Sequence, residues 1–225
     1  MPMHSTLLAT TKRRRSRITP RQAEALAAGS DRLLHLVGDP PGLSVDIGDL
    51  FPTGTPLILD IGFGTGEPVE ILARQEPDSG VIAVDLHTPG IGDLLHRIES
   101  GGLDNVVVLE ADIRVLLPLL PAQSLAGVRT FFPDPWPKKR HHRRRLVTSE
   151  FASNLAERVI PGGFWHLATD WPDYAEQIAS VVPASGLWSG GVIARPEHRP
   201  ITRYESYAQQ SGRTAIDLWF ERIPG

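Results

Sequence analysis

The sequence predicts an α/β fold built on a mainly parallel sheet. From residue 56 onward, short apolar runs alternate with longer stretches of helical periodicity, which is typical of strands joined by crossover helices. The expected strands are 57–61, 81–85, 106–110, 126–132 and 164–169, and the expected helices are 67–75, 89–100, 143–159 and 172–181. Two last runs, 188–195 and 215–222, are expected to close the sheet as an antiparallel pair.

The N-terminal part is predicted to hold an arm, a helix and a loop. Residues 1–20 are basic and lack hydrophobic periodicity, so we expect a flexible basic arm. Thr19-Pro20 resembles a helix start, because proline is favoured at the first helical position, and this helix should stop near Gly29. Residues 38–56 are rich in glycine and proline and should form a loop. We expect residues 21–225 to form one domain.

The composition excludes several chemistries. The 225 residues, 41% hydrophobic and 22% charged, suit one soluble domain with a full core. The absence of cysteine excludes disulfides, thiolate catalysis and cysteine-bound zinc. No apolar run approaches the about 20 residues of a membrane helix, and the N-terminus lacks the apolar segment of a secretory signal. Its arginine-rich start leaves a transit peptide open, but we expect a cytoplasmic protein.

Charge is strongly polarised along the chain. The net charge is −3, yet residues 12–17 hold five Lys or Arg and residues 138–145 hold six, with no acid in either stretch. These 11 of the 23 basic residues leave 12 against 26 acidic ones elsewhere. Like charges at this density repel one another unless a counter-anion binds, and a phosphate backbone is the obvious anion. A solvated helix face is the alternative for 138–145.

A glycine-rich loop follows the first strand. Its three glycines, Gly62, Gly64 and Gly66, permit positive φ and let a ligand approach the backbone closely. In the dinucleotide-binding pattern the third glycine comes one residue later. Asp60 precedes the loop, where a carboxylate suits an ammonium group better than a pyrophosphate.

Two more acids follow the next strand ends. Asp85 ends the second strand, where a carboxylate can accept hydrogen bonds from both ribose hydroxyls, and Asp112 follows the third, within reach of an adenine amino group. S-adenosylmethionine has an ammonium, a ribose and an adenine but no phosphate, so it fits these acids better than NAD. Each acid alone is more often solvated or a helix cap. Their common place at the ligand-binding edge of an open sheet favours a cofactor site.

The fourth strand ends in Phe131-Phe132-Pro133-Asp134-Pro135-Trp136. Two prolines fix the backbone around Asp134 and would hold its carboxylate in a set direction beside an aromatic ring. The alternative is a rigid turn with Trp136 packed inside. The two histidines that follow shortly, His141 and His142, are adjacent, which disfavours metal ligation, and we expect no metal site.

Two further segments bring chemistry to the later part of the chain. Asp170 ends the fifth strand and is either a site residue or a helix N-cap. Residues 201–205 are expected to form a loop that combines a hydroxyl, a cation, an aromatic ring and an acid, which together could contact a base.

With these segments in view, the chain resembles the bacterial tRNA (guanine-N7-)-methyltransferases. The shared motifs are RITPRQ, LDIGFGTG, AVDLHTPG, FFPDPW with its basic tail, ATDW, TRYE and DLWFER, over nearly the whole length. The resemblance implies a class I S-adenosylmethionine-dependent methyltransferase fold, with a Rossmann-like, mostly parallel sheet of seven strands and helices on both faces. It implies methyl transfer from S-adenosylmethionine to N7 of the variable-loop guanosine, position 46 of tRNA. S-adenosylhomocysteine would be the product, and no protein partner is evident.

The resemblance also assigns roles to the matching positions. Asp134 is expected at the catalytic centre. The expected cofactor contacts are Asp60, Gly62, Gly64, Gly66, Asp85, Asp112 and Asp134. The expected substrate contacts are Lys138, Asp170, Thr202, Arg203, Tyr204 and Glu205, and the expected RNA-facing residues are Arg140, His141, His142, Arg143, Arg144 and Arg145. Asp60 and Asp85 stand where glutamate is more usual and Arg203 where lysine is, so the charges are kept while the contacts can differ.

The expected reaction needs positioning more than proton transfer, because guanine N7 already carries a free lone pair. Asp134, aided by Asp170 and Glu205, is expected to accept hydrogen bonds from the guanine N1–H and amino group. The nucleotide is expected to be drawn outward first. Two other functions stay open: methyl transfer to a small molecule or protein, and RNA binding without catalysis. The salt dependence of binding tests the first, and cofactor binding tests the second.

Overall fold

The computed structural model describes residues 17–28, 33–35 and 50–224. Most of the predicted arm and most of the predicted loop over 38–56 lie outside the described residues. The helix predicted at Thr19-Pro20 is confirmed as α1, Pro20–Ala28. A capping box stabilises its first turn: the Thr19 amide donates to Oε1 of Gln22 at 2.8 Å, and the Gln22 amide donates to Oγ1 of Thr19 at 3.3 Å.

One eight-stranded sheet organises the described chain, in the order β1-β4-β3-β2-β5-β6-β8-β7. The strands are β1 (Leu33–His35), β2 (Leu57–Ile61), β3 (Gly80–Asp85), β4 (Val106–Glu110), β5 (Leu125–Phe131), β6 (Val159–Thr169), β7 (Trp188–Ile193) and β8 (Ile216–Arg222). Every pairing is parallel except those of β8, which runs antiparallel to β6 and β7. The seven predicted strands are confirmed, including the closing pair. β1 is an additional three-residue edge strand, too short for a sequence pattern to reveal.

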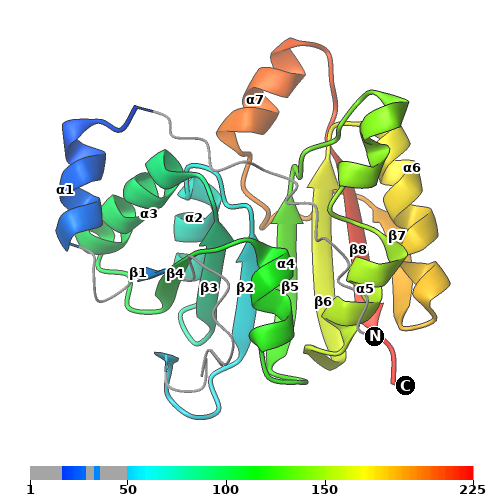
Figure 1. Cartoon of the computed structure of the whole chain (residues 1–225), viewed down its shortest axis with the longest axis horizontal. Coiled ribbons are helices and arrows are strands. Elements are labelled where there is room, and N and C mark those ends of the chain that lie inside the picture. The colour runs from blue at the N-terminus through cyan, green and yellow to red at the C-terminus, as the bar shows by residue number, and fades with distance from the viewer. Residues whose placement is uncertain (1–16, 29–32, 36–49, 225) are drawn as a thin grey trace, which may run out of the picture.

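Helices cover both faces of the sheet (Figure 1). They are α2 (Glu67–Gln75), α3 (Thr88–Gly101), α4 (Ile113–Leu116), α5 (Ser149–Ala156), α6 (Pro172–Val181) and α7 (Arg203–Gln210), with 3-10 helices η3 (Leu117–Leu119), η4 (Lys139–Arg144) and η5 (Pro183–Ser185). Val81 and Ala83 of β3 belong to a core shared with α1, α2 and α3, whereas Ile82 and Val84 belong to a core shared with α4, α5 and α6. Burial on both faces explains why these strands are apolar throughout.

The helix predicted over 143–159 is confirmed only for Ser149–Ala156, which form α5. The basic run forms η4, α5 begins only at Ser149, and β6 begins at Val159, five residues before the predicted strand. Thr148 separates the two helices because its side chain accepts a hydrogen bond from the Phe151 amide at 3.1 Å, which makes it the N-cap of α5. Among the described residues, no helix is both long and apolar enough to cross a bilayer.

The loop predicted over 201–205 is confirmed for residues 201–202 and wrong from Arg203, which begins α7. This helix stands beyond the carboxyl ends of β5 and β6 (Figure 1), the edge of the sheet at which open α/β folds bind ligands. The described fold therefore places α7 and the loop after β2 at the same edge.

Candidate active site

The loop after β2 has a backbone that depends on glycine. Gly62, Gly64 and Gly66 have φ of 75°, 62° and 73°, values that residues with a side chain rarely adopt. A Cβ atom at Gly66 would also lie 2.6 Å from Cβ of Leu94 on α3. The close packing of this loop on α3 therefore requires glycine.

Asp60 is a buried carboxylate with an unused oxygen. The residue is 3% exposed, and its Oδ2 has no hydrogen-bond partner among the described residues. Burial raises the pKa of Asp60 to about 7; the positive charge of Arg129 opposes the rise, and the negative charge of Asp85 adds to it. A buried, unsatisfied carboxylate oxygen is costly unless a cationic donor reaches it. The site is therefore suited to an ammonium group.

Asp85 and Asp112 are both engaged by backbone amides. Oδ2 of Asp85 accepts a hydrogen bond from the Gly64 amide at 3.0 Å, and its Oδ1 accepts from the amides of Leu86 and His87 at 2.6 and 2.9 Å. Asp112 is the N-cap of α4 and accepts from the Arg114 amide at 2.9 Å. These bonds fix both carboxylates at the ends of their strands, and each acid keeps acceptor capacity for a ligand.

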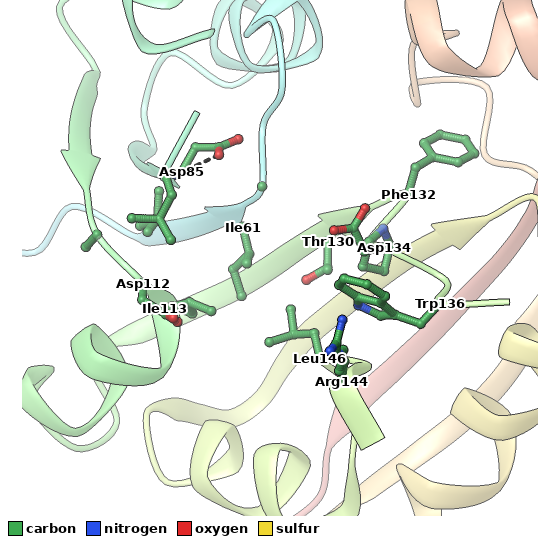
Figure 2. Close-up of a pocket in the computed structure, with 15 residues that line it drawn as sticks. Ile61, Asp85, Asp112, Ile113, Thr130, Phe132, Asp134, Trp136, Arg144 and Leu146 are labelled. Atoms are coloured by element: carbon green, nitrogen blue, oxygen red, sulfur yellow. Dashed lines mark hydrogen bonds between the residues drawn. The ribbon is translucent and has the colours of Figure 1, made fainter. Parts of the chain in front are cut away.

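A cleft of about 240 Å³ opens between these acids and the turn after β5. Figure 2 shows Asp85 and Asp112 on one side and Asp134, Trp136 and Arg144 on the other. Aliphatic side chains line the space between them: Ile61, Val84, Ile113 and Leu146. An apolar slot with acids at its rim is suited to a flat heterocycle attached to a hydroxylated sugar.

A second cavity of about 430 Å³ adjoins the first, since Gly62 and Phe132 line both. One wall is Asp60 with the glycine loop. The opposite wall is Thr202, the N-cap of α7, together with Arg203, Tyr204 and Tyr207 of that helix. The two cavities therefore lie side by side, with the buried Asp60 carboxylate at the second and Asp85 at the first.

The turn after β5 is strained on both sides of Asp134. Phe132 and Trp136 have φ of 54° and 46°, in the left-handed region that costs a bulky residue about 1–3 kcal/mol. Such strain persists only where the surroundings hold it. The Phe132 amide donates to the Ala168 carbonyl at 2.7 Å, and Arg145 holds the far side through the Pro135 carbonyl. Asp134 itself is exposed at the rim of the cleft.

The basic run divides into an exposed part and one buried residue. Lys138, Arg140, Arg143 and Arg144 are exposed, and the Arg144 guanidinium lies 4.9 Å from the ring centre of Trp136. Arg145, expected to face RNA, is 1% exposed. That expectation fails for its side chain, which is enclosed by α6. His141 packs edge-on against Trp136, and the neighbouring arginines and Lys138 add to desolvation in lowering its pKa.

Two of the expected substrate residues have carboxylates that pair with an arginine of the protein. Glu205 accepts two hydrogen bonds from Arg199, at 2.7 and 2.9 Å, and is buried. Asp170 is also buried; its Oδ2 lies 2.8 Å from Nη1 of Arg213 but has no hydrogen-bond partner among the described residues. Because α6 takes Trp171 as its N-cap, Asp170 is no helix cap. Neither carboxylate lines either cavity. Lys138 lines neither cavity and lies just before η4.

The TRYE segment contributes its first three residues to the second cavity. Thr202 is the N-cap of α7 and accepts from the Glu205 amide at 2.9 Å. The Tyr204 ring centre lies 5.3 Å from that of Phe132. Tyr207, which we did not predict as a site residue, lines the same cavity because it lies one turn after Tyr204 on the same helical face. Reading T-x-x-E as a capping signature would have predicted this helix and with it Tyr207.

The fold is that of the class I methyltransferases. Solved structures with this fold include the antibiotic-resistance methyltransferase Kmr (TM-score 0.56, 18% identity, 84% of this chain and 97% of that chain). The 16S rRNA methyltransferase KamB is another (TM-score 0.57, 21% identity, 75% of this chain and 88% of that chain). At such identities the likeness concerns the fold alone.

Sequence relatives narrow this class to one family. The family described as "Putative methyltransferase" matches residues 54–218. The tRNA (guanine-N(7)-)-methyltransferase of Streptomyces avermitilis is 45% identical over 217 residues, covering 93% of this chain and 73% of that protein. That of Nitrosospira multiformis is 40% identical over 210 residues, covering 91% and 92%. The chain belongs to the tRNA (guanine-N(7)-)-methyltransferase family, as its motifs predict.

Proposed function

We propose that this protein transfers a methyl group from S-adenosylmethionine to N7 of the variable-loop guanosine, position 46 of tRNA, and that it does so in the cytoplasm. The relatives' names support the reaction. The observation that carries the proposal is the unsatisfied, buried Asp60 carboxylate, together with Asp85 and Asp112 at the adjoining cleft. A dinucleotide would instead bring a pyrophosphate against the Asp60 carboxylate, which the charge disfavours.

The residues present fit S-adenosylmethionine. Asp60 would take the ammonium group, Asp85 the ribose hydroxyls and Asp112 the adenine amino group, while the aliphatic lining of the first cleft would enclose the ring. When bound, this cofactor supplies an electrophilic methyl group on a sulfonium. The backbone of Gly62 and Gly64 can approach it closely because neither residue has a side chain. Among the described residues, no group of three or more potential metal ligands occurs.

The α7 side of the second cavity, opposite Asp60, is the proposed guanine site. Phe132 and Tyr204 offer aromatic faces on which a purine can stack, and Asp134 stands at the adjoining rim. Because N7 needs no deprotonation, the work of the site is orientation and stabilisation of the positive charge that develops on the ring. Asp134 would accept hydrogen bonds from the guanine N1–H and amino group. Thr202 and Arg203 would contact the rest of the nucleotide.

The exposed basic residues would hold the tRNA during the reaction. Lys138, Arg140 and Arg143 present their charges to solvent beside the turn that carries Asp134. A phosphate backbone relieves their mutual repulsion, and recognition by charge and shape suits a folded RNA. Arg144 and Trp136 together would border both the cofactor cleft and this basic surface.

The proposal is tested by methyl transfer from labelled S-adenosylmethionine to unmodified tRNA transcripts, followed by borohydride–aniline cleavage at 7-methylguanosine. We expect one cleavage at the variable-loop guanosine and none when that base is adenosine. Label without cleavage would overturn the N7 assignment. Cofactor binding without any label on tRNA would favour a small-molecule or protein substrate, and tRNA binding without cofactor binding would favour a non-catalytic RNA-binding protein.

A further inference from the structure

Arg199 is the centre of a buried charged network beneath the second cavity. Its side chain is fully buried, and its guanidinium meets two carboxylates. Nη1 and Nη2 donate to the two oxygens of Glu205 at 2.7 and 2.9 Å. Nη2 also donates to Oδ2 of Asp217 at 3.0 Å, and Nε lies 2.6 Å from the other oxygen of Asp217. Asp217 in turn bonds Nε2 of His166 at 2.9 Å.

This network joins parts of the chain that are distant in sequence. His166 is on β6 and Asp217 on β8, so the sheet holds one end. Glu205 is in the first turn of α7, so the helix holds the other. Between them, the Arg199 guanidinium lies 5.8 Å from the ring centres of both Phe131 and Phe132. Arg199 therefore touches the β5 side and the α7 side of the second cavity at once.

The two buried carboxylates, Glu205 and Asp217, need the positive charge of the Arg199 guanidinium. Burial would raise the pKa of Asp217, but the hydrogen bond from His166 and the charge of Arg199 outweigh it, so that pKa is lowered. Desolvation lowers the pKa of His166, so its imidazole is mostly uncharged at pH 7. Arg199 is thus the buried cation facing two buried carboxylates, and removing one partner of such a group leaves charge unpaired.

We propose that Arg199 is a positioning residue that docks α7 on the sheet and thereby sets the distance between Tyr204 and Phe132 in the substrate cavity. Glu205 acts through Arg199 and not on the guanine. Thr202 caps the helix that Glu205 anchors, and Arg203 and Tyr204 are in its first turn, so a shift of that turn moves the whole α7 wall. This inference rests on the proposed function for its kinetic consequence, but the docking itself is a property of the folded chain.

The kinetic test uses Arg199→Lys and Glu205→Gln, singly and together. Lysine keeps the charge but cannot bridge both carboxylates, and glutamine keeps the size of Glu205 without its charge. We expect kcat, counted per cofactor-binding site, to fall about 100-fold in each single variant, because displacing a substrate-positioning wall by about 1 Å can cost that much. The affinity for S-adenosylmethionine should stay within about twofold of that of the unaltered protein. The double variant should be no slower than the slower single one.

Arg195→Lys is the matched control. Arg195 lies on the same segment and its Nε is 3.9 Å from Oε1 of the same Glu205, but its side chain is 38% exposed. Lysine at this position keeps a positive charge near Glu205 and a hydrogen-bond donor for the Arg199 carbonyl. Because an exposed ion pair contributes little free energy, kcat should stay within about twofold of that of the unaltered protein. If Arg199→Lys behaves like this control, or if the two single losses multiply in the double variant, Glu205 acts on the substrate and the proposal is overturned.

Hydrogen exchange of α7 tests the docking without any activity. Amides of 203–210 should exchange at least tenfold faster in Arg199→Lys and in Glu205→Gln, while those of β2 and β5 keep their protection. Unchanged protection of α7 would overturn the proposal, whatever the enzyme does. Absence of methyl transfer by the unaltered protein would instead refute the proposed function and leave this result standing.

Discussion

Nε of Arg145 donates a hydrogen bond to the carbonyl oxygen of Pro135 at 2.8 Å. The same guanidinium donates to Gln177 and Asp173 of α6, each at 2.6 Å, and lies 4.7 Å from the ring centre of Tyr174. Pro135 directly follows Asp134, and α6 begins two residues after Asp170. One buried arginine at the end of the basic run therefore ties the turn that carries Asp134 to the helix that follows Asp170.

Arg145→Ala should impair the turn and leave the electrostatic grip on tRNA intact. The substitution leaves the Pro135 carbonyl and the Gln177 side chain without their donor, so we expect the free energy of unfolding to fall by about 2–3 kcal/mol. It should lower kcat by at least about tenfold through misplacement of Asp134. Denaturant unfolding and steady-state kinetics measure both. The slope of log tRNA affinity against log salt should not change, and a shallower slope would mean that Arg145 contacts phosphate.

Arg143→Ala, two residues away, should leave stability unchanged and weaken the electrostatic binding of tRNA. Arg143 is exposed, so stability should stay within about 0.5 kcal/mol. Losing one phosphate contact should weaken tRNA binding and make the salt slope shallower by about one unit. Filter binding over a range of salt concentrations gives that slope. A slope identical to that of the unaltered protein would remove Arg143 from the RNA surface.

Asp134→Ala should abolish methyl transfer with little effect on binding. The carboxylate is exposed at the rim, so its removal leaves no buried group unpaired, and the fold should be retained. We expect kcat to fall by at least about 100-fold, since stabilisation of the developing charge is lost, with tRNA affinity within about twofold. Single-turnover assays at saturating tRNA measure the step. Turnover close to that of the unaltered protein would refute the role of Asp134.

Cofactor affinity should depend on the protonation of Asp60. Burial, which outweighs the nearby Arg129, raises the pKa of Asp60 to about 7, so its carboxyl is mostly neutral at pH 6 and mostly ionised at pH 8. Because an ammonium needs the carboxylate, affinity for S-adenosylmethionine should rise by up to about tenfold per pH unit below 7 and then level off. Calorimetry at pH 5.5 to 7.5 should also detect proton release on binding. In Asp60→Asn the affinity should be low and should not vary with pH over this range.

The same pKa has a consequence for stability without cofactor. An unfolded aspartate titrates near its ordinary pKa of 3.8, whereas the folded Asp60 titrates at about 7, so between these values the native state binds more protons. The contribution of Asp60 to the free energy of unfolding therefore decreases as pH rises from 4 to 7. Comparing Asp60→Asn with the unaltered protein across this range isolates it, and an equal pH dependence in both would contradict the raised pKa.

The sequence predicted the sheet well because its strands are buried on both faces. Short apolar runs that lie between two predicted helices, such as 81–85 and 106–110, are typical of central strands. The glycine loop and the strand-end acids were placed for the same reason, since parallel strands end at one edge of the sheet. The order of motifs then identified the family.

The sequence did not predict which charged side chains are buried and paired inside the protein. Arg145 looks like its neighbours in the chain, yet it turns inward because Asp173 and Gln177 lie across from it in space. Glu205 reads as part of a polar loop, but Arg199, six residues earlier, takes its carboxylate. No local pattern reports such partners, since the pairing is made by tertiary contacts. The helix that begins at Arg203 was the exception, because its capping signature was present in the sequence.

The central claim is methyl transfer to N7 of one guanosine, and atomic replacement of N7 tests it most directly. A tRNA assembled with 7-deazaguanosine at position 46 has a C–H where N7 would be, while its pairing edge is unchanged. A second tRNA with the same replacement at another guanosine is the control. We predict that the control accepts one labelled methyl group per molecule and that the first tRNA binds but accepts none. Equal labelling of both would contradict the account, because the methyl group would then go elsewhere.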